Sequence, residues 1–543
     1  MQCKSWQASD EGIYLYNPNS GILDIVACYH PILPVERMKN LETGEERIKL
    51  AYKRNRRWNE IIVPKTMVTS ANKIVALSGR GISVTSSVML FDYNGYRINI
   101  LDSPGHQDFS EDTYRTLVAA DSAVMLIDAA KGVEQQTIKL FQVCRKRNIP
   151  IFTFVNKLDR AGKNPFDLMD EIETVLGIRA CPMNWPIGTD GDFKGVYHRE
   201  SGTVELFSGG NHGQSKVDSQ TGRADDPALL QLLGEYHHKK LIEDIELLDV
   251  AGDEFALDKV LSGQLTPMFF GSAMNNFGVQ PFLEKFLTIT TPPSAREADI
   301  GWIDPEDEEF TGFIFKIQAN MNPAHRDRIA FMRICSGRFE KGMSVKLART
   351  DKELKLAQPQ QFMAQEREGV EEAFAGDIIG LFDPGIFALG DTVYTGRRVA
   401  FAGIPVFAPE HFARIKPVDT MKRKQFLKGI TQLAQEGAIQ IFKDNAYAAE
   451  EIIVGVVGVL QFEVLEHRLK TEYNVEISSQ QLNFRFIRWL PEDTETEQLK
   501  LSSSTKIAKD LKDRPVVLFE NDWSMRWAEE NNKGLVLSDI SER

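Results

Sequence analysis

Short apolar blocks recur along the chain from about Tyr96 onward, and longer mixed segments separate them. The runs "YRINIL", "AVMLIDA", "IPIFTFVN" and "TPMFFGSA" have the length and composition of strands, and "AVMLIDA" is expected to be a buried one. The segments "SEDTYRTLVAA" and "EQQTIKLFQVCRKRN" are typical of helices, and Ser110 is expected to cap the first of them. This βαβαβ succession predicts an α/β domain with a parallel sheet and helices on both faces, which binds ligands at the carboxyl ends of its strands.

The pattern of the chain changes after this region. Residues 184–266 are partly Gly-rich and predict an insertion with exposed hairpins, while 293–306 lack periodicity and are typical of a linker. Four short apolar runs separated by turn residues over 307–400 predict a small antiparallel β-barrel. Over 401–543, strands on either side of the helix "VLQFEVLEHRLKTEY" predict an α+β domain of the split βαβ type.

Composition narrows the class of protein. At 543 residues the chain is too long for one ordinary core, and its 42% apolar and 26% charged residues are typical of a soluble globular protein. A net charge of −13 argues against general coating of nucleic acid but allows local basic patches. The five cysteines have no zinc spacing, and neither a long apolar run nor a leader is evident. We therefore expect a cytoplasmic protein that does not cross a membrane.

Three short motifs follow three of the predicted strands of the α/β domain. They are Asp102-Ser103-Pro104-Gly105, Asn156-Lys157-Leu158-Asp159 and Gly271-Ser272-Ala273-Met274. Four-residue patterns recur by chance, so for each motif taken alone an ordinary surface loop is the simpler explanation. Their order, spacing and placement after strands together predict a GTP-binding domain over 79–292.

The first motif contains the groups that a GTPase uses around its phosphates. A carboxylate that ends a strand, such as Asp102, holds the magnesium shell, and the backbone N–H of Gly105 meets the γ-phosphate. His106 then lies where a side chain can position the attacking water. Further upstream, the Ser83 hydroxyl in "RGISV" is a candidate Mg²⁺ ligand, although a solvent-facing strand residue is the simpler reading.

The other two motifs are expected to read the base. The Asp159 carboxylate can accept two hydrogen bonds from guanine that adenine cannot donate. Lys157 would lay its stem along the ring plane, and the backbone at Ser272 and Ala273 would meet the guanine oxygen.

Longer stretches carry a family resemblance. "LDSPGHQDFSEDTYRTLVAADSAVMLIDAAKGVE", "FTFVNKLDR", "FTGFIFKIQANMNPAHRDRIAFMRICSGRFEKGM" and "VGVVGVLQFEVLEHRLKTEYNVE" closely resemble the bacterial peptide chain release factor 3 family, translational GTPases similar to elongation factor G. The resemblance covers about 79–543, and "DFSEDTYRTL" is typical of this family in particular. It implies GTP or GDP and Mg²⁺ as ligands, a monomer that acts on the ribosome, and removal of class I release factors at termination.

One expected motif is missing from the sequence. GTPases of this kind carry a G-x-x-x-x-G-K-[ST] loop that cradles the phosphates, but the only Gly-Lys pair here is Gly162-Lys163, followed by Asn164. Residues 1–78 form an atypical segment that contains none of the sequence stretches expected of the family. Three explanations of the missing loop are open. The reading frame is shifted upstream of about Ser78, or the segment is a replacement that leaves a non-hydrolysing ribosome-binding protein, or the phosphate site is built from unfamiliar residues.

Overall fold

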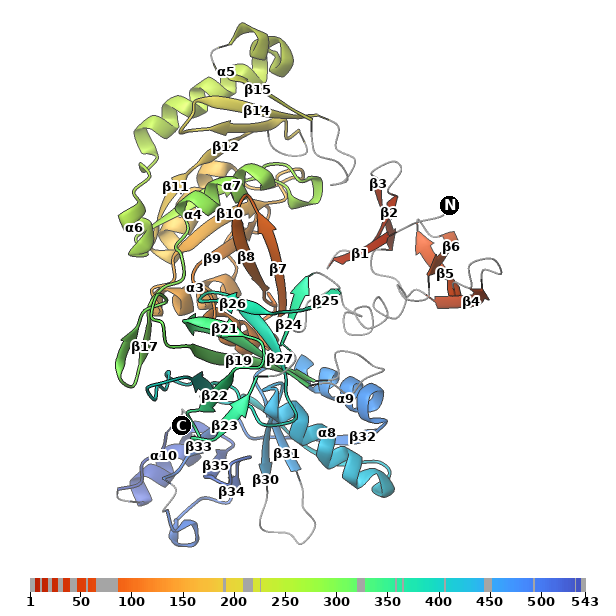
Figure 1. Cartoon of the computed structure of the whole chain (residues 1–543), viewed down its shortest axis with the longest axis vertical. Coiled ribbons are helices and arrows are strands. Elements are labelled where there is room, and N and C mark those ends of the chain that lie inside the picture. Colours follow the sequence, from red (N-terminus) through yellow and green to blue (C-terminus); the bar gives the residue numbers. More distant parts are fainter. Residues whose placement is uncertain are drawn as a thin grey trace. The chain divides into compact units, whose positions relative to one another are not determined.

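The structure is a computed structural model whose elements are labelled in Figure 1. It describes the chain outside 1–4, 10–11, 18–21, 28–32, 40–45, 55–56, 65–85, 189–191, 209–217, 225, 320–327, 357–358, 364–365, 405–406, 444–451, 492–493, 533 and 539–543. The chain forms two compact units, and each is described by itself below. The first comprises Met1–Val84 and Ala120–Thr291, and the second comprises Thr85–Ala119 and Pro292–Arg543.

The first unit starts with two antiparallel three-stranded sheets, in the orders β1-β2-β3 and β4-β5-β6. Their strands are β1 Ser5–Ser9, β2 Gly12–Asn17, β3 Ile22–Ala27, β4 Leu33–Lys39, β5 Glu46–Arg54 and β6 Arg57–Pro64. These six strands occupy part of the segment 1–78 whose sequence departs from the family pattern.

A parallel sheet forms the centre of the first unit and confirms the predicted α/β class. Its strands run in the order β11-β16-β10-β9, and every neighbouring pair is parallel. Phe152, Phe154 and Phe269 from β10 and β16 are buried together with side chains of α7. The elements are β9 Ala123–Asp128, α3 Gln135–Lys146, β10 Ile151–Asn156, α4 Pro165–Leu176, β11 Arg179–Pro182, β16 Leu265–Phe270, η2 Ala273–Asn275 and α7 Val279–Ile289.

The strand predicted at "YRINIL" is not part of this sheet, so that part of the βαβαβ prediction is wrong. It is β8 (Tyr96–Asp102), which belongs to the second unit and pairs antiparallel with β7 (Ser87–Tyr93). The two-residue loop between them is Asn94-Gly95, with φ values of 49° and 81°. Positive φ at both residues is the geometry of a type I′ hairpin turn, which pairs β8 locally with β7.

Two smaller expectations also fail. The strand β9 was expected to be buried, but it is the last strand in the order of its sheet, with Val124 41% and Leu126 63% exposed. Ser110 does not cap the following helix, because it is the first helical residue of α2 (Ser110–Val118) and Phe109 occupies the cap position without a side-chain hydrogen bond.

The insertion contains the predicted hairpins and, in addition, a long helix. An antiparallel sheet of β12 Asn184–Ile187, β13 Gly195–His198, β14 Thr203–Ser208 and β15 Asp218–Arg223 is followed by α5 Pro227–Ala251 and α6 Leu257–Leu261. The helix α5 is interrupted at Gly234, whose φ and ψ are 76° and 161°.

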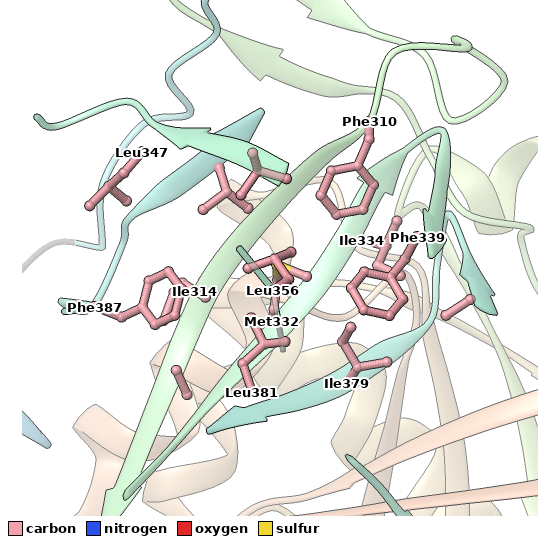
Figure 2. Packing of buried hydrophobic residues seen from close by; sticks show 14 of the residues in the cluster. Phe310, Ile314, Met332, Ile334, Phe339, Leu347, Leu356, Ile379, Leu381 and Phe387 are labelled. Carbon is pink, nitrogen blue, oxygen red and sulfur yellow. The ribbon is translucent and has the colours of Figure 1, made fainter. Parts of the chain in front are cut away.

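The second unit contains the predicted barrel, whose apolar core is shown in Figure 2. Its main sheet runs in the order β23-β22-β28-β19-β20-β27-β24-β25, and all its pairs are antiparallel. Phe310, Met332 and Phe339 are fully or nearly fully buried in the core. The segment expected as a linker contains a hairpin, β17 with β18, and Ile303 of β18 is buried beside barrel residues.

The strands of this part are β17 Arg296–Ala298, β18 Gly301–Ile303, β19 Thr311–Ala319, β20 Arg328–Ser336, β21 Arg338–Glu340, β22 Ser344–Leu347, β23 Glu353–Lys355, β24 Pro359–Met363, β25 Glu366–Gly369, β26 Glu372–Phe374, β27 Ile378–Phe382 and β28 Thr392–Tyr394.

The C-terminal part confirms the split βαβ prediction. Its sheet runs in the order β32-β29-β31-β30-β34-β35-β33, so β31 separates the two strands that α8 connects and β29 separates the two that α9 connects. The elements are β29 His411–Pro417, η3 Thr420–Lys422, α8 Arg423–Gln435, β30 Gln440–Lys443, β31 Ile452–Val456, α9 Leu460–Tyr473, β32 Ile477–Leu482, β33 Phe486–Trp489, η4 Thr496–Gln498, β34 Thr505–Lys509, β35 Pro515–Phe519 and α10 Asp522–Asn531. Among the residues that the structure describes, no helix is long and apolar enough to cross a membrane.

Candidate functional site

Two loops at the carboxyl edge of the parallel sheet carry the predicted base-reading residues. Because β10 and β16 are parallel neighbours, the loops that follow them lie side by side. Leu158 is 2% exposed, and its backbone N–H donates to the Gly271 carbonyl over 3.2 Å. This buried leucine and its hydrogen bond anchor the first loop to the second.

Polar side chains connect the two loops further. Asn156 Oδ1 accepts hydrogen bonds from the N–H of Lys157 at 2.8 Å and from the N–H of Ala273 at 2.9 Å. The Ser272 hydroxyl donates to Asp159 Oδ1 at 2.5 Å. The structure therefore brings Asn156, Asp159, Ser272 and Ala273 together, as the motif order led us to expect.

The backbone around Gly271 is tightly packed. A Cβ at this position would lie 2.8 Å from Phe154 Cζ and would also overlap the Phe277 carbonyl. Ser272 and Phe277 exchange backbone hydrogen bonds of 2.9 Å in both directions. The glycine thus lets the chain turn sharply after β16 and places Ser272 under Asp159.

Asp128, at the end of β9, belongs to this site although the sequence analysis did not single it out. Its Oδ2 lies 3.2 Å from Lys157 Nζ, and its Oδ1 accepts from the Ala130 N–H at 2.9 Å. Burial acts to raise the pKa of Asp128, but these two partners outweigh it and hold the pKa below its ordinary value. Its position at the carboxyl end of a predicted strand is the signal that could have identified it.

These residues carry the kinds of group predicted to read the edge of a guanine base. Asp159 supplies a carboxylate held by Ser272, with its side chain 19% exposed, and the Lys157 side chain is 37% exposed above the loop. Lys157 adopts a φ of 70°, which is uncommon for a residue with a Cβ and turns the loop between Asn156 and Asp159. The Asp159 carboxylate can accept hydrogen bonds from two donors, the exposed backbone can donate to a carbonyl, and the stem of Lys157 can lie along the face of a ring.

The predicted phosphate-sensing residues lie in the second unit. β8 ends at Asp102, and the chain continues through Ser103 and a buried Pro104, whose carbonyl accepts from the Thr113 hydroxyl at 2.9 Å. Gly105 is exposed, and a Cβ there would meet nothing within 4 Å. Ser83, the other candidate Mg²⁺ ligand, lies outside the described residues.

His106 is oriented by the loop that follows it. Its Nδ1 accepts a hydrogen bond from the Asp108 N–H at 3.3 Å and lies 3.5 Å from Asp108 Oδ1. The imidazole side chain is 36% exposed and its ring lies 6.2 Å from that of Phe109. With Nδ1 facing Asp108, Nε2 is the ring nitrogen left to meet a water, so the imidazole suits holding a water at this position.

The helix after this loop is attached to the C-terminal part of the same unit. Asp108 Oδ2 accepts from the Leu460 N–H at the start of α9 over 2.8 Å. Arg115 of α2 pairs with Glu111 at 2.6 Å and donates to the Gly437 carbonyl at 2.8 Å, and both ionic side chains are less than a tenth exposed. The sequence analysis did not identify this contact, although 108, 111, 112 and 115 recur at helical spacing.

A second set of charges, of which Lys316 is buried and Asp112 half-buried, joins α2 to the barrel. Asp112 Oδ2 accepts from the Ser86 N–H, and the Lys316 ammonium donates to the Ser86 carbonyl and, at 2.8 Å, to its hydroxyl. Burial acts to raise the pKa of Asp112, but Lys316 and Arg115 lower it further than burial raises it. The pKa of Lys316 is lowered by burial, against the opposing attraction of Asp112.

No cluster of three or more His, Cys, Asp or Glu side chains suited to hold a metal ion occurs in the described part of the chain.

Three family profiles match successive parts of the chain. They are the elongation factor Tu GTP-binding domain over 58–292, elongation factor G domain 2 over 309–396, and the C-terminal domain of class II release factor RF3 over 401–529. The first match begins before residue 79 and reaches into the atypical segment.

Curated relatives decide the family. Peptide chain release factor 3 of Symbiobacterium thermophilum is 59% identical over 457 residues, which cover 84% of this chain and 87% of the relative. The chain belongs to the peptide chain release factor 3 family. Members from Listeria monocytogenes and Synechocystis are each 51% identical, and each match covers 85% of this chain and 88% or 85% of the relative.

The fold agrees with that of a known structure. A crystal structure of a Thermus thermophilus protein aligns with a TM-score of 0.61 at 19% identity, covering 81% of this chain and 66% of that one. This release factor 3 family member therefore has a GTPase-type domain with a parallel sheet, followed by antiparallel barrel sheets and the family's C-terminal domain.

Proposed function

We propose that this chain binds GTP and Mg²⁺, hydrolyses GTP on the ribosome, and promotes dissociation of class I release factors at translation termination. It would act in the cytoplasm as a monomer. Membership in the release factor 3 family supports the reaction class. The observation that carries guanine recognition is the Asp159–Ser272 hydrogen bond of 2.5 Å beside the Asn156–Ala273 contact of 2.9 Å.

Separate residues would perform separate tasks in this reaction. Asp159 and Lys157 would read the base with the backbone at Leu158, Ser272 and Ala273, while Asp128 orients the lysine. In the second unit Asp102 would hold the ion with Ser83, and Gly105 would donate its N–H to the γ-phosphate beside Ser103 and Pro104. His106 would keep a water in line with the bond that breaks. Bound Mg²⁺ neutralises phosphate charge.

A non-hydrolysing ribosome-binding protein is the second candidate, and one observation favours it. The G-x-x-x-x-G-K-[ST] pattern, whose backbone and lysine normally cradle the β- and γ-phosphates, does not occur in this sequence. Phosphate contacts at a helix N-terminus supply both binding energy and transition-state stabilisation. If these phosphate contacts are missing, we expect the loops at Asn156–Asp159 and Ser272–Ala273 to keep their preference for guanine, and we expect the affinity of the chain for GTP to be lower.

Titration of the purified full chain with a fluorescent GTP analogue in magnesium distinguishes the two candidates. Binding in the micromolar range together with phosphate release that ribosomes stimulate supports the GTPase. Absence of binding at tens of micromolar, in a preparation that still sediments with ribosomes, contradicts the GTPase and favours the second candidate. A release assay with ribosomes stalled at a stop codon then tests whether class I factors leave faster.

A further inference from the structure

A groove in the second unit is not used by the proposed reaction. Its volume is about 630 Å³, and it lies between the end of β27 in the barrel and one face of α8, with the last turn of α9 closing it. The residues of α8 that line it, including Lys428, Gln432 and Gln435, recur every three or four positions along the helix. The opposite face of α8, with Phe426, Ile430 and Leu433, is buried against the C-terminal sheet.

Hydrogen-bond donors dominate the walls of this groove. Gln432 Oε1 already accepts from the Tyr473 hydroxyl at 2.7 Å, and Gln435 Oε1 accepts from Arg328 at 2.5 Å. With both amide oxygens engaged, each glutamine turns its NH₂ group toward further partners. Lys428 is exposed and adds a positive charge to the same wall.

Each of the two acids of the groove has an arginine partner. Asp383 pairs with Arg328 at 2.9 Å, and its other oxygen accepts from the backbone N–H groups of Gly385 and Ile386 at 2.8 and 2.7 Å. Glu472 pairs with Arg468 at 2.8 and 3.1 Å, and Arg468 also donates to Glu436 at 2.8 Å. The groove thus suits a ligand that is negative and rich in acceptors.

Positive charge continues from the groove to the start of α8. Residues 414–428 contain six Lys or Arg and one acid, Asp419, a local excess of five in a chain of net charge −13. The helix sequence "RKQFLKGITQLAQ" contains no acidic residue, so no i,i+4 ion pair within α8 balances its cations. Cations in the first turn also oppose the helix dipole, an arrangement that costs stability and that a bound anion would relieve.

An aromatic ring lies at the barrel side of the groove. Phe382, the last residue of β27, lines the groove and is 48% exposed. An exposed ring next to donors and cations is the combination by which proteins bind unpaired nucleotides, since the base stacks and the phosphates pair with lysine.

We propose that this groove and the basic start of α8 bind single-stranded RNA. Phosphates follow Lys416, Lys424 and Lys428, while a base stacks on Phe382 and receives hydrogen bonds from the amides of Gln432 and Gln435. The proposal rests on the proposed function, because it names ribosomal RNA chemistry as the partner of this surface. An acidic peptide would match the cations but would bring no flat ring for Phe382.

The test measures fluorescence anisotropy of a labelled single-stranded RNA decamer with the full chain, without nucleotide, over a range of salt concentrations. We expect Lys424→Gln with Lys428→Gln to lower the slope of log affinity against log salt by about 1.4, which corresponds to two lost phosphate contacts. Phe382→Ala should weaken binding by roughly five- to a hundredfold and leave the salt slope unchanged, because it removes stacking and no charge.

The matched control is Lys346→Gln with Lys352→Gln, which removes the same charge elsewhere in the barrel. Lys346 lies on β22, which three strands separate from β27 in the sheet order, and both lysines are exposed.

Equal weakening of RNA binding by the control and the test variants would overturn the proposal, as would unchanged binding by Phe382→Ala. Preference for double-stranded RNA, or stronger competition by poly-glutamate than by RNA, would also overturn it. Failure of GTP binding would not affect this assay, so the two proposals fail separately.

Discussion

At the scale of single residues, the candidate site divides between side chains that are held and side chains that are presented. Asn156 and Ser272 are held, since the groups that would otherwise meet a ligand hydrogen-bond to neighbouring loops. Asp159 and His106 are presented, because each has one atom fixed by a hydrogen bond while its side chain stays 19% or 36% exposed, respectively. Substitutions of the presented residues should therefore affect ligand and chemistry more than folding.

Replacing His106 by alanine tests its role at the water. If the chain turns over GTP, we expect His106→Ala to reduce the rate on the order of a hundredfold and leave nucleotide affinity nearly unchanged, because a group that positions the water acts in the reaction and not in binding. Single-turnover phosphate release and a nucleotide titration measure the two quantities. Equal loss of both would show that the imidazole supports the loop through Asp108.

Replacing Asp159 by asparagine tests base reading. The amide keeps an oxygen for the Ser272 hydroxyl, so the loop should remain folded, but it loses the negative charge that favours two donors of guanine. We expect the preference for guanine over xanthine nucleotides to fall by at least about tenfold. Competition between the two nucleotides measures this ratio, and an unchanged ratio would refute the role given to Asp159.

At the scale of elements, the hydrophobic pattern of the sequence predicted those strands and helices whose formation depends on residues close together in the chain. The strands β10 and β16 were identifiable because "IPIFTFVN" and "TPMFFGSA" are continuous apolar runs, and both are buried in the parallel sheet. The hairpin of β7 and β8 also carries a local signal, since Asn-Gly between two strands indicates a type I′ turn, but this signal was not used in the prediction. In α5, Leu229, Leu233, Leu241 and Leu248 form a buried stripe that Gly234 and the Gly-rich stretch before the helix obscure.

Contacts between distant segments were not predictable in the same way. The pairing of Lys157 with Asp128 depends on β9 and β10 being parallel neighbours, which brings the two strand ends together. The pairing of Arg115 with Gly437 joins positions 322 apart in the sequence. Spacing of charged residues indicates that such a helix face has partners, but it does not say which ones.

The junction between α2 and the barrel makes a prediction about pH. The folded pKa of Asp112 lies below its ordinary value of 3.8, chiefly because Lys316 opposes the effect of burial. Asp112 therefore contributes stability that is fully present above the unfolded pKa and is lost as the pH falls below about 4 through the folded pKa. Asp112→Asn keeps an acceptor for the Ser86 N–H but removes the opposite charge that most favours the buried ammonium of Lys316.

We expect Asp112→Asn to lower the free energy of unfolding of the second unit by about 2 kcal/mol at pH 7. Because the contribution of Asp112 is already lost in strong acid, the variant and the parent should converge near pH 2. Urea unfolding at a series of pH values measures both. A constant difference between the two proteins from pH 7 to pH 2 would contradict the assigned role.

At the scale of the whole molecule, the predicted site is divided between the two compact units. Asn156 to Asp159, with Ser272 and Ala273, belong to the first, whereas Asp102 to His106 belong to the second with the C-terminal domain. The loop 102–106, which is predicted to sense the nucleotide, is thus part of the same unit as α9, and Asp108 connects the two through the Leu460 N–H. The predicted base-reading residues and the predicted γ-phosphate loop therefore belong to different units.

Amide hydrogen exchange on the full chain can separate these two effects. At saturating GDP, we expect slower exchange at Leu158 and Ala273, whose N–H groups hold the base-reading loops, and little change at Leu460. With a non-hydrolysable GTP analogue, contact of Gly105 with the γ-phosphate should shift the loop and weaken the Asp108–Leu460 hydrogen bond. Exchange at Leu460 should then quicken by at least about tenfold, which corresponds to about 1.4 kcal/mol of local opening free energy.

Val475, whose N–H donates to the Leu469 carbonyl at the far end of α9, is the internal control and should not change. Identical exchange at Leu460 with both nucleotides would show that this loop does not report the γ-phosphate to the C-terminal domain.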